Sequence, residues 1–262
     1  MRIKPIVKVM NFHSLIRVDK ARKKAEKYLK LEREASDIID LIANNRNFQL
    51  DKKLWSIDET KPPLNIYIGS DFGFCGNINF TVNQYIEQDT DADKILIGRK
   101  LRQSAQRLVL SLPRENFYSD YNKIHDLLEA TIMGKEHSQI NLIYNHFYNT
   151  SRIEITKKKI FPFDIEVGTK VYTEDFFVEG DANRILYNLL TSYVNYEVKI
   201  AEVNSYASEN IYRQNSTSES LKKIDEIEAE QLVQVRKERV AKEFEKVIDN
   251  FTKKMAKSGG LQ

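Results

Sequence analysis

The chain has 262 residues, of which 41% are hydrophobic and 30% are charged. Its 41 basic and 38 acidic residues leave a net charge of only +3, so bulk charge gives no support to nucleic-acid binding. The single cysteine, Cys75, excludes an internal disulfide and is typical of a reducing compartment. The start MRIKPIVKVMNF lacks a signal-peptide pattern, and no apolar run approaches the roughly 18 residues of a membrane span. We therefore expect a cytoplasmic protein.

The first predicted element is a helix from Val18 to Ile42, a stretch without glycine or proline. Its apolar residues fall at spacings of 3, 4 and 7, which place them on one helix face. They are Ala21, Ala25, Tyr28, Ala35, Ile39 and Ile42. Charged residues fill the other faces, so this helix needs a partner along one stripe.

The middle of the chain alternates strand patterns with helix patterns. We expect strands at Leu64–Ser70, Lys94–Gly98, Leu108–Leu112, Ile140–Asn149 and Ser151–Phe161. We expect helices at Thr81–Gln88, Arg99–Leu108 and Asn122–Met133. Alternation followed by two consecutive strands predicts an α/β domain of roughly 110 residues, bounded by Pro62-Pro63 and by Pro162.

The last predicted element is a helix from about Asp181, its expected N-cap, to Met255, again without glycine or proline. At 1.5 Å per residue it would reach on the order of 100 Å if unbroken, which is far more than a domain of this size needs. The polar segment Ser205–Ser220 separates its two apolar stretches, so we expect the helix to pass through different environments. Two long helices at opposite termini with a globular segment between them indicate a shaft that carries a knob.

Three glycines, Gly69, Gly73 and Gly76, lie in the loop after the first expected strand. A glycine-rich loop that opens a helix can hold a phosphate group. However, the spacing is not G-x-G-x-x-G, and no G-K-[ST] follows, so both common nucleotide fingerprints fail. A tight strand-to-helix turn is the favoured interpretation, and a nucleotide site is the weaker alternative.

Cys75 lies within the same loop, close to an expected helix N-terminus, where a thiolate would be favoured. A Cys–His catalytic pair would need His13, His125, His137 or His146 nearby, and no local signature ties any of them to Cys75. A small buried cysteine is the better interpretation. No spacing of histidine, cysteine and carboxylate residues suggests a metal site. We therefore expect no catalytic residue and no metal site in this chain.

At Ser70–Asn79 the sequence SDFGFCGNIN resembles the SDRGLCGGLN segment of the γ subunit of F-type ATP synthases. Phe72 replaces the arginine of that segment, and Asn77 replaces a glycine. Further segments resemble that family in the same order and at fitting intervals. They are ILIGRK (Ile95–Lys100), LIYNHF (Leu142–Phe147), Phe161-Pro162, FVEGDANRILYNLL (Phe177–Leu190), SYASENIYR (Ser205–Arg213), Arg236, and AKEFEKVI (Ala241–Ile248).

The resemblance implies a divergent γ-like subunit, the central rotor shaft of an F-type or F-type-like rotary ATPase. The implied fold class is α/β, with a long antiparallel coiled coil of the N- and C-terminal helices and an inserted Rossmann-like α/β domain. The corresponding division of the chain is residues 1–60, 61–178 and 179–262. In this family the shaft stands inside a ring of nucleotide-binding subunits and performs no bond chemistry, so we expect a non-catalytic chain.

The resemblance also implies the partners. A hexamer of α- and β-like subunits would surround the shaft and hold ATP, ADP and Mg, while this chain binds no cofactor. Arg236 and Glu243 match family positions that contact the ring and are the candidate partner-contact residues, with a solvated helix charge as the equal alternative for Glu243. Ser208 and Glu209 match a helix segment that we expect to pack against the α/β domain. An ε-like subunit, a membrane rotor ring at the cytoplasmic face of the membrane, and motility-complex proteins are partners left open.

Two departures from the family fall in the shaft. The N-terminal helix lacks the IT.AM.MVAA.K pattern, and QNSTSESLKKI replaces the family's run after Arg213 in an interval about three residues short. These departures favour a specialised paralogous complex of the kind found in mollicutes over an energy-conserving synthase. In some gliding species such a complex is linked to motility. Two alternatives stay open, namely a small α/β enzyme with Cys75 as nucleophile and a non-catalytic coiled-coil scaffold.

Overall fold

The computed structural model describes residues 3–44, 58–163 and 179–258, with side chains described up to 254. The elements in chain order are α1 (Ile3–Ala43), β1 (Leu64–Ile68), α2 (Ile78–Gln88), β2 (Asp93–Ile97), β3 (Leu108–Leu112), the 3-10 turn η2 (Arg114–Asn116), α3 (Tyr121–Gly134), β4 (Ile140–Asn149), β5 (Arg152–Phe161) and α4 (Ala182–Ser258). The contacts divide the chain into two units. One is Asn11–Ser216, and the other combines Met1–Met10 with Thr217–Gln262.

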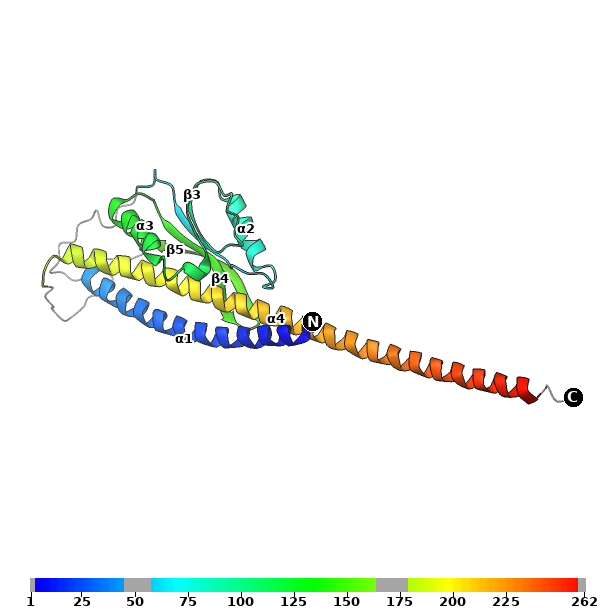
Figure 1. The fold of residues 1–262 in the computed structure, drawn as a ribbon. Coiled ribbons are helices and arrows are strands. Elements are labelled where there is room, and N and C mark those ends of the chain that lie inside the picture. The colour runs from blue at the N-terminus through cyan, green and yellow to red at the C-terminus, as the bar shows by residue number, and fades with distance from the viewer. Residues whose placement is uncertain (1–2, 45–57, 164–178, 259–262) are drawn as a thin grey trace. The chain divides into compact units, whose positions relative to one another are not determined.

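The unit Asn11–Ser216 holds a five-stranded sheet in the order β3-β2-β1-β4-β5 (Figure 1). The pairs β1–β2, β1–β4 and β2–β3 are parallel, and β5 pairs antiparallel with β4 at one edge. Ile66 of β1 pairs with Ile95 of β2 on one side and with Leu142 of β4 on the other. All five residues of β1 are buried, as expected for a central parallel strand that is covered on both faces.

Helices cover both faces of this sheet, α2 on one and α3 with α4 on the other (Figure 1). Successive strand residues point to opposite faces, so each strand serves two cores. Tyr67, Leu96 and Ile143 pack with Val82 and Ile86 of α2. The opposite face packs with α3 and with Val194, Val198 and Ala201 of α4. The long C-terminal helix is therefore also a wall of the domain's core.

Within the same unit, α1 lies along α4 in the antiparallel direction (Figure 1). Three groups of contacts mark the seam: Ile39 and Ile42 with Leu186 and Leu190, Ala21 with Val203 and Ala207, and Asn11 with Gln214. Residue numbers fall along α1 as they rise along α4, which fixes the antiparallel direction. The expected pair of terminal helices is confirmed.

The predicted stripe of α1 is confirmed, because Ala21, Ala35, Ile39 and Ile42 are all buried. The helix is longer than predicted, since it begins at Ile3 rather than at Val18. Pro5 lies in its first turn, where the missing N–H has no intrahelical partner to lose.

The predicted helix at Arg99–Leu108 is wrong, because this segment is a series of turns. Asn83 of α2 takes over the backbone groups that a helix would have paired internally. Its Oδ1 accepts from Arg102 N (2.9 Å) and its Nδ2 donates to Lys100 O (3.2 Å). Arg107 then adopts the left-handed conformation, with φ 57°, directly before β3.

α4 is a single helix of 77 residues. Asp181 caps its start as predicted, because Oδ1 accepts from Asn183 N (2.9 Å) and the carbonyl accepts from Ile185 N (3.0 Å). Residue 178, the predicted boundary before this helix, lies outside the described residues. The division at 60 and 178 stays a prediction.

The second unit consists of Met1–Met10 and Thr217–Gln262. In this unit the first turns of α1 contact α4. Lys4 Nζ lies 2.5 Å from both Asp225 Oδ1 and Glu228 Oε2. Every described side chain from Asp225 to Lys254 is exposed. None of the described helices combines the length and the apolar character needed to cross a bilayer.

We expect Ile39→Ala to lower the free energy of unfolding by about 2–5 kcal/mol, because it removes a 3% exposed side chain from the α1–α4 seam. The neighbouring Ile38 is 45% exposed and provides the matched control. Chemical denaturation followed by circular dichroism measures both variants. Equal losses for Ile38→Ala and Ile39→Ala would contradict the seam.

Candidate functional site

The segment Ser70–Asn79 forms a tight loop between β1 and α2. Asn79 locks it, because its Oδ1 accepts from Ser70 N (2.9 Å) and its Nδ2 donates to Ser70 Oγ (2.7 Å). Gly76 has φ +59°, and a Cβ there would lie 3.1 Å from Tyr212 of α4. A glycine is therefore required where the loop meets α4, which supports the turn interpretation of these glycines.

Asp71 ties this loop to the segments that follow β2 and β3. Its Oδ1 accepts from the backbone N–H groups of Arg99 (2.8 Å) and Arg114 (2.9 Å), and its Oδ2 accepts from Glu115 N (2.9 Å). Burial alone would raise the pKa of Asp71, but the three N–H donors outweigh burial and hold this pKa below its ordinary value. Asp71 is thus an ionised anchor for three loops.

Cys75 is a buried thiol, only 2% exposed. Its Sγ donates to Phe72 O (3.4 Å) and lies 3.5 Å from Ser70 Oγ and from Asn79 Nδ2. Burial raises the pKa of the thiol, although the hydrogen bond with Ser70 works in the opposite direction. Three histidines bond elsewhere: His125 to Asn195, His137 to Thr131 and Asp93, and His146 to Tyr144. The environment keeps the thiol protonated, which disfavours a nucleophilic role.

Arg114, just after β3, connects the sheet to α4. Its Nη2 lies 2.7 Å from Glu202 Oε1 and its Nη1 lies 3.5 Å from Glu209 Oε2. Its Cζ also lies 3.7 Å from the centre of the Tyr206 ring. Residues 202, 206 and 209 follow each other at spacings of four and three, so they share one face of α4. The glutamate side chains are only 3% exposed, so each needs a cationic partner.

Tyr118 and Arg213 complete this group. Tyr118 OH donates to Glu202 Oε2 (2.6 Å), and burial together with the charge of Glu202 raises the pKa of Tyr118. Arg213 pairs with Glu209 and donates to Gly73 O (3.4 Å) in the loop after β1. We call Arg114, Tyr118, Glu202, Glu209 and Arg213 the ion cluster. It joins two loops of the α/β domain to α4.

The ion cluster accounts for much of the polar segment Ser205–Ser220. Polar side chains of this segment are buried rather than solvated: Ser205, Ser208, Glu209, Asn210 and Arg213. Ser208 Oγ donates to Asn145 O of β4 (3.0 Å). The expectation that Ser208 and Glu209 pack against the α/β domain is confirmed.

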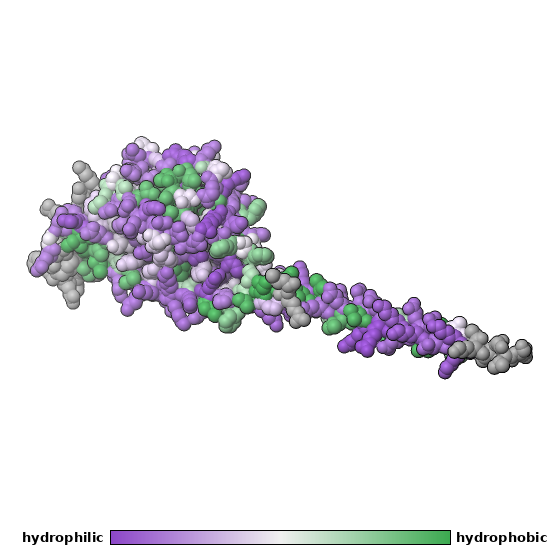
Figure 2. Space-filling view, viewed as in Figure 1, coloured by the Kyte–Doolittle hydropathy of each residue, from purple (hydrophilic) through white to green (hydrophobic). Residues whose placement is uncertain are grey.

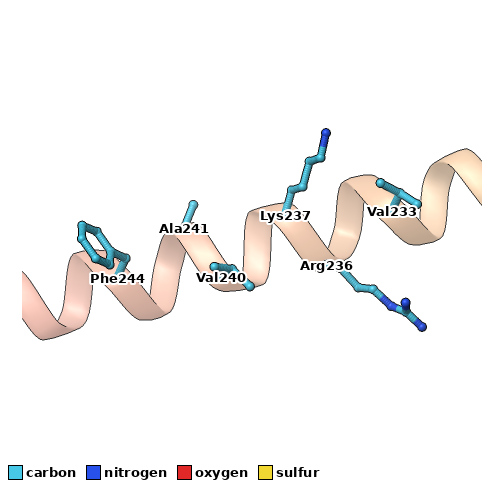
Figure 3. Close-up of a pocket in the computed structure, with 6 residues that line it drawn as sticks. All are labelled: Val233, Arg236, Lys237, Val240, Ala241 and Phe244. Atoms are coloured by element: carbon cyan, nitrogen blue, oxygen red, sulfur yellow. The ribbon is translucent and has the colours of Figure 1, made fainter.

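The candidate partner-contact residues Arg236 and Glu243 lie on the exposed part of α4, in the unit with Met1–Met10. Arg236 extends from a shallow, largely apolar surface, on the opposite side of the helix from Lys237 (Figure 3). Glu243 accepts from Arg239 Nε (3.3 Å) in an exposed pair one turn apart. Their contact role stays a prediction.

Around Arg236, α4 presents apolar side chains to solvent at spacings of seven, four, three and four. They are Val233, Val240, Phe244, Val247 and Phe251, each 50% to 67% exposed. Figure 2 shows such apolar patches among the hydrophilic side chains of this helix. We call these five residues the apolar stripe.

Sequence reasoning did not single out Arg114, Tyr118 or Glu202. A signal for Glu202 was present, because it directly follows Ala201 and lies one turn after Val198, both in the core. A carboxylate on a buried helix face predicts a basic partner, but the sequence does not show which arginine this is. Within the described residues, no group of three or more His, Cys, Asp or Glu residues is placed to hold a metal ion.

An α/β sheet packed on a helix pair made from the two ends of the chain is the architecture of a rotary-ATPase central stalk. A chain in the Tetrahymena thermophila mitochondrial ATP synthase central stalk and c-ring structure has this fold, with a TM-score of 0.55 and 20% identity over 82% of this chain and 99% of that chain. A chain in the Euglena gracilis mitochondrial ATP synthase OSCP/F1/c-ring structure gives a TM-score of 0.51 and 15% identity, covering 94% and 96%.

A family model described as ATP synthase matches residues 1–244. The ATP synthase gamma chain of Mycoplasma mycoides subsp. mycoides SC is 27% identical over 229 residues, which cover 82% of this chain and 81% of that one. The gamma chain of Clostridium perfringens is 24% identical over 240 residues, covering 85% and 82%. The chain therefore belongs to the ATP synthase γ-subunit family as a divergent member, and it is a non-catalytic subunit of the central stalk.

We expect Asp71→Asn to destabilise the fold at pH 7 by about 1–3 kcal/mol, because buried N–H donors lose their ionised acceptor. The folded pKa of Asp71 is lowered, so its contribution is complete above the unfolded pKa of roughly 3.9 and is lost as the pH falls through the folded pKa. Urea denaturation should therefore show a gap between wild type and variant that narrows in strong acid. Exposed Asp37→Asn is the control, and a gap independent of pH would contradict the anchor.

We expect Arg114→Ala to cost about 3–5 kcal/mol of unfolding free energy, because it leaves Glu202 and Glu209 buried and short of a cation. Arg99→Ala breaks the half-exposed pair with Glu115 and should cost no more than about 1 kcal/mol. Arg114→Lys should rescue only part of the loss, since lysine lacks the planar fork and the stacking on Tyr206. Chemical denaturation measures all three variants, and a neutral Arg114→Ala would refute the ion cluster.

Proposed function

We propose that this chain is the rotating shaft inside a hexamer of α- and β-like nucleotide-binding subunits. It couples nucleotide hydrolysis or synthesis in those subunits to its own rotation. In this proposal ATP, ADP and Mg bind to the partner subunits, and this chain binds no cofactor.

The apolar stripe on α4 is the observation that carries the proposal. Full burial of a valine or phenylalanine side chain is worth about 1.5–3 kcal/mol, so five such side chains in water favour enclosure by other chains. Arg236 and Glu243 lie beside the stripe, where they can contact the same enclosing surface. A ring that meets different sides of one helix receives a different contact free energy at each subunit, and this difference is what coupling requires.

The ion cluster supports the same proposal, because a rotating shaft must be held firmly to the α/β domain that it carries. Pulling the α/β domain away from α4 would leave Glu202 and Arg114 without their charged partners. That separation is costly, so the cluster resists any movement between the sheet and this part of α4.

We further propose that the complex is a specialised paralogous one, with gliding motility as its narrower role. The altered N-terminal helix and the QNSTSESLKKI run support this proposal, together with 27% identity to the Mycoplasma mycoides gamma chain. Proposed further partners are an ε-like subunit, a membrane rotor ring and motility-complex proteins. The proposed location is the cytoplasm, at the cytoplasmic face of the cell membrane. Identifying the proteins and ion-pumping activity of the native complex tests these points.

Purification of the tagged chain from native lysate, followed by native mass spectrometry, tests the shaft. We expect one copy of the chain with a hexamer of two kinds of nucleotide-binding subunit. Recovery of the chain alone, as a monomer that hydrolyses a substrate, would support the enzyme alternative instead.

We expect Arg236→Ala to lower ATP hydrolysis by the complex roughly tenfold or more, because a charge-assisted hydrogen bond is worth about 1.5–3 kcal/mol. The melting temperature of the isolated chain should not change, since Arg236 is exposed. Lys123→Ala on α3 removes an exposed charge from the α/β domain and is the control. Unchanged hydrolysis for Arg236→Ala would remove Arg236 from the proposed contact.

A further inference from the structure

The exposed part of α4 has a shallow hollow whose lining follows one spacing rule. Its lining residues are Val233, Arg236, Lys237, Val240, Ala241 and Phe244 (Figure 3). They form two overlapping sets of four, 233-236-237-240 and 237-240-241-244, each at positions i, i+3, i+4 and i+7. In a coiled coil, four residues of one helix form the hole that receives a side chain of the facing helix. The hollow therefore has the shape that an α-helix, rather than a small molecule, would fill.

The apolar stripe has the spacing of a coiled-coil seam. Its three valines recur every seven residues, and each of its two phenylalanines follows a valine by four residues. These are the two core positions of a heptad repeat. The remaining core positions from 230 to 254 hold Glu230, Lys237 and Lys254. Every described side chain from Asp225 to Lys254 is exposed, so this seam is available to a second helix.

The stripe is also symmetric about position 242 of the chain. Val240 and Phe244 each lie two residues from that position, and Val233 and Phe251 each lie nine residues from it. If two identical helices lie antiparallel and centred on this position, each of these valines faces a phenylalanine of the other copy. A two-fold interface between identical chains must be self-complementary in this way. The symmetry therefore favours a second copy of this chain as the facing helix.

The charged core positions favour the antiparallel direction. Glu230 and Lys254 each lie twelve residues from position 242, so an antiparallel pair places opposite charges at both ends of the seam. Lys237 would face Val247 of the second copy, where its aliphatic stem can pack while its ammonium group stays in water. A parallel pair would instead place Lys237 against the same lysine of the second copy, and like charges in a core position repel each other.

We propose that copies of the chain that are not yet assembled with other subunits pair through their α4 helices, antiparallel and centred on position 242. The apolar stripe of each copy covers that of the other, which removes an exposed apolar surface from the free chain. Enclosure of the stripe by other subunits and pairing of two copies exclude each other, so the dimer must dissociate before assembly. The proposal does not rest on the proposed function, because it uses only contacts between two copies of this helix.

The expected contact is small. The seam from Glu230 to Lys254 spans about 37 Å at 1.5 Å per residue, and a helix is about 10 Å wide. A strip of this size covers roughly 370 Å² per copy, about half of the roughly 800 Å² that a stable interface buries on each partner. The dimer should therefore be weak, form at high protein concentration and dissociate on dilution. Such a dimer protects the free chain without withholding it from assembly.

Sedimentation velocity of the purified full chain, from low to high micromolar concentration, tests the pairing. We expect a monomer–dimer equilibrium that Val240→Lys weakens at least about tenfold, because a charge enters the apolar contact with Phe244 of the second copy. Val235→Lys is the matched control, because Val235 is 61% exposed on the same helix but lies outside the heptad core positions, and Val240 is 64% exposed. A chain that stays monomeric throughout, or an equal effect of both substitutions, would overturn the proposal.

Cysteine cross-linking tests the direction of the helices. Val240→Cys and Phe244→Cys chains are oxidised separately and as a mixture, with the wild-type chain as control because its Cys75 is buried. A disulfide needs Cα atoms within about 7 Å, so we expect efficient cross-linking only in the mixture, where the two cysteines face each other. Equally efficient cross-linking of either variant alone would overturn the antiparallel pair. Neither result changes the composition of the native complex, which tests the proposed function separately.

Discussion

The burial of two carboxylates on α4 is the constraint on which the arrangement of the α/β domain depends. Glu202 and Glu209 are removed from water, so both need basic or hydroxyl partners. Glu209 pairs with Arg213 of the same helix, whereas Glu202 takes its partners from outside the helix. Arg114 and Tyr118 come from the segment after β3. Arg114 also donates its backbone N–H to Asp71, which itself holds the loops after β1 and β2. The need to pair these buried charges thus holds three loops of the sheet against α4, and these loops hold the sheet in place relative to that helix.

α4 passes through three environments, and its amino-acid composition differs in each. Around Val194 and Val198 it lies on the sheet and is apolar. From Glu202 to Arg213 it meets loops, whose polar backbone groups need polar side chains to bond with. After Asp225 its described side chains are all exposed, and its composition alternates between charged and apolar residues. A single helix can therefore pack on a domain along one stretch and be exposed along another.

Much of this architecture could be predicted from sequence, because buried apolar residues recur along the chain with the period of a helix or a strand. The strands and α3 were found within a few residues, and so was the stripe from Ala21 to Ile42. The segment Arg99–Leu108 was misjudged because its backbone bonds go to Asn83 of α2, and no local pattern encodes such a distant bond. Arg114 could not be predicted for the same reason, because its partners Glu202 and Glu209 lie far away in the sequence. The first turns of α1 were missed because the amphipathic stripe used to define the helix begins only at Ala21.

The contribution of Val194, Val198 and Ala201 to the sheet has a consequence for synthesis on the ribosome. Every described strand is complete at Phe161, but one apolar face of the sheet, which α3 also covers, gains the part of its cover that α4 provides only when residue 201 has left the exit tunnel. Until then the nascent chain exposes a sheet face and its edges, the surfaces most prone to aggregation. The shaft helix is therefore also the last wall of the domain, and a chain cut short before residue 201 loses a domain as well as a shaft.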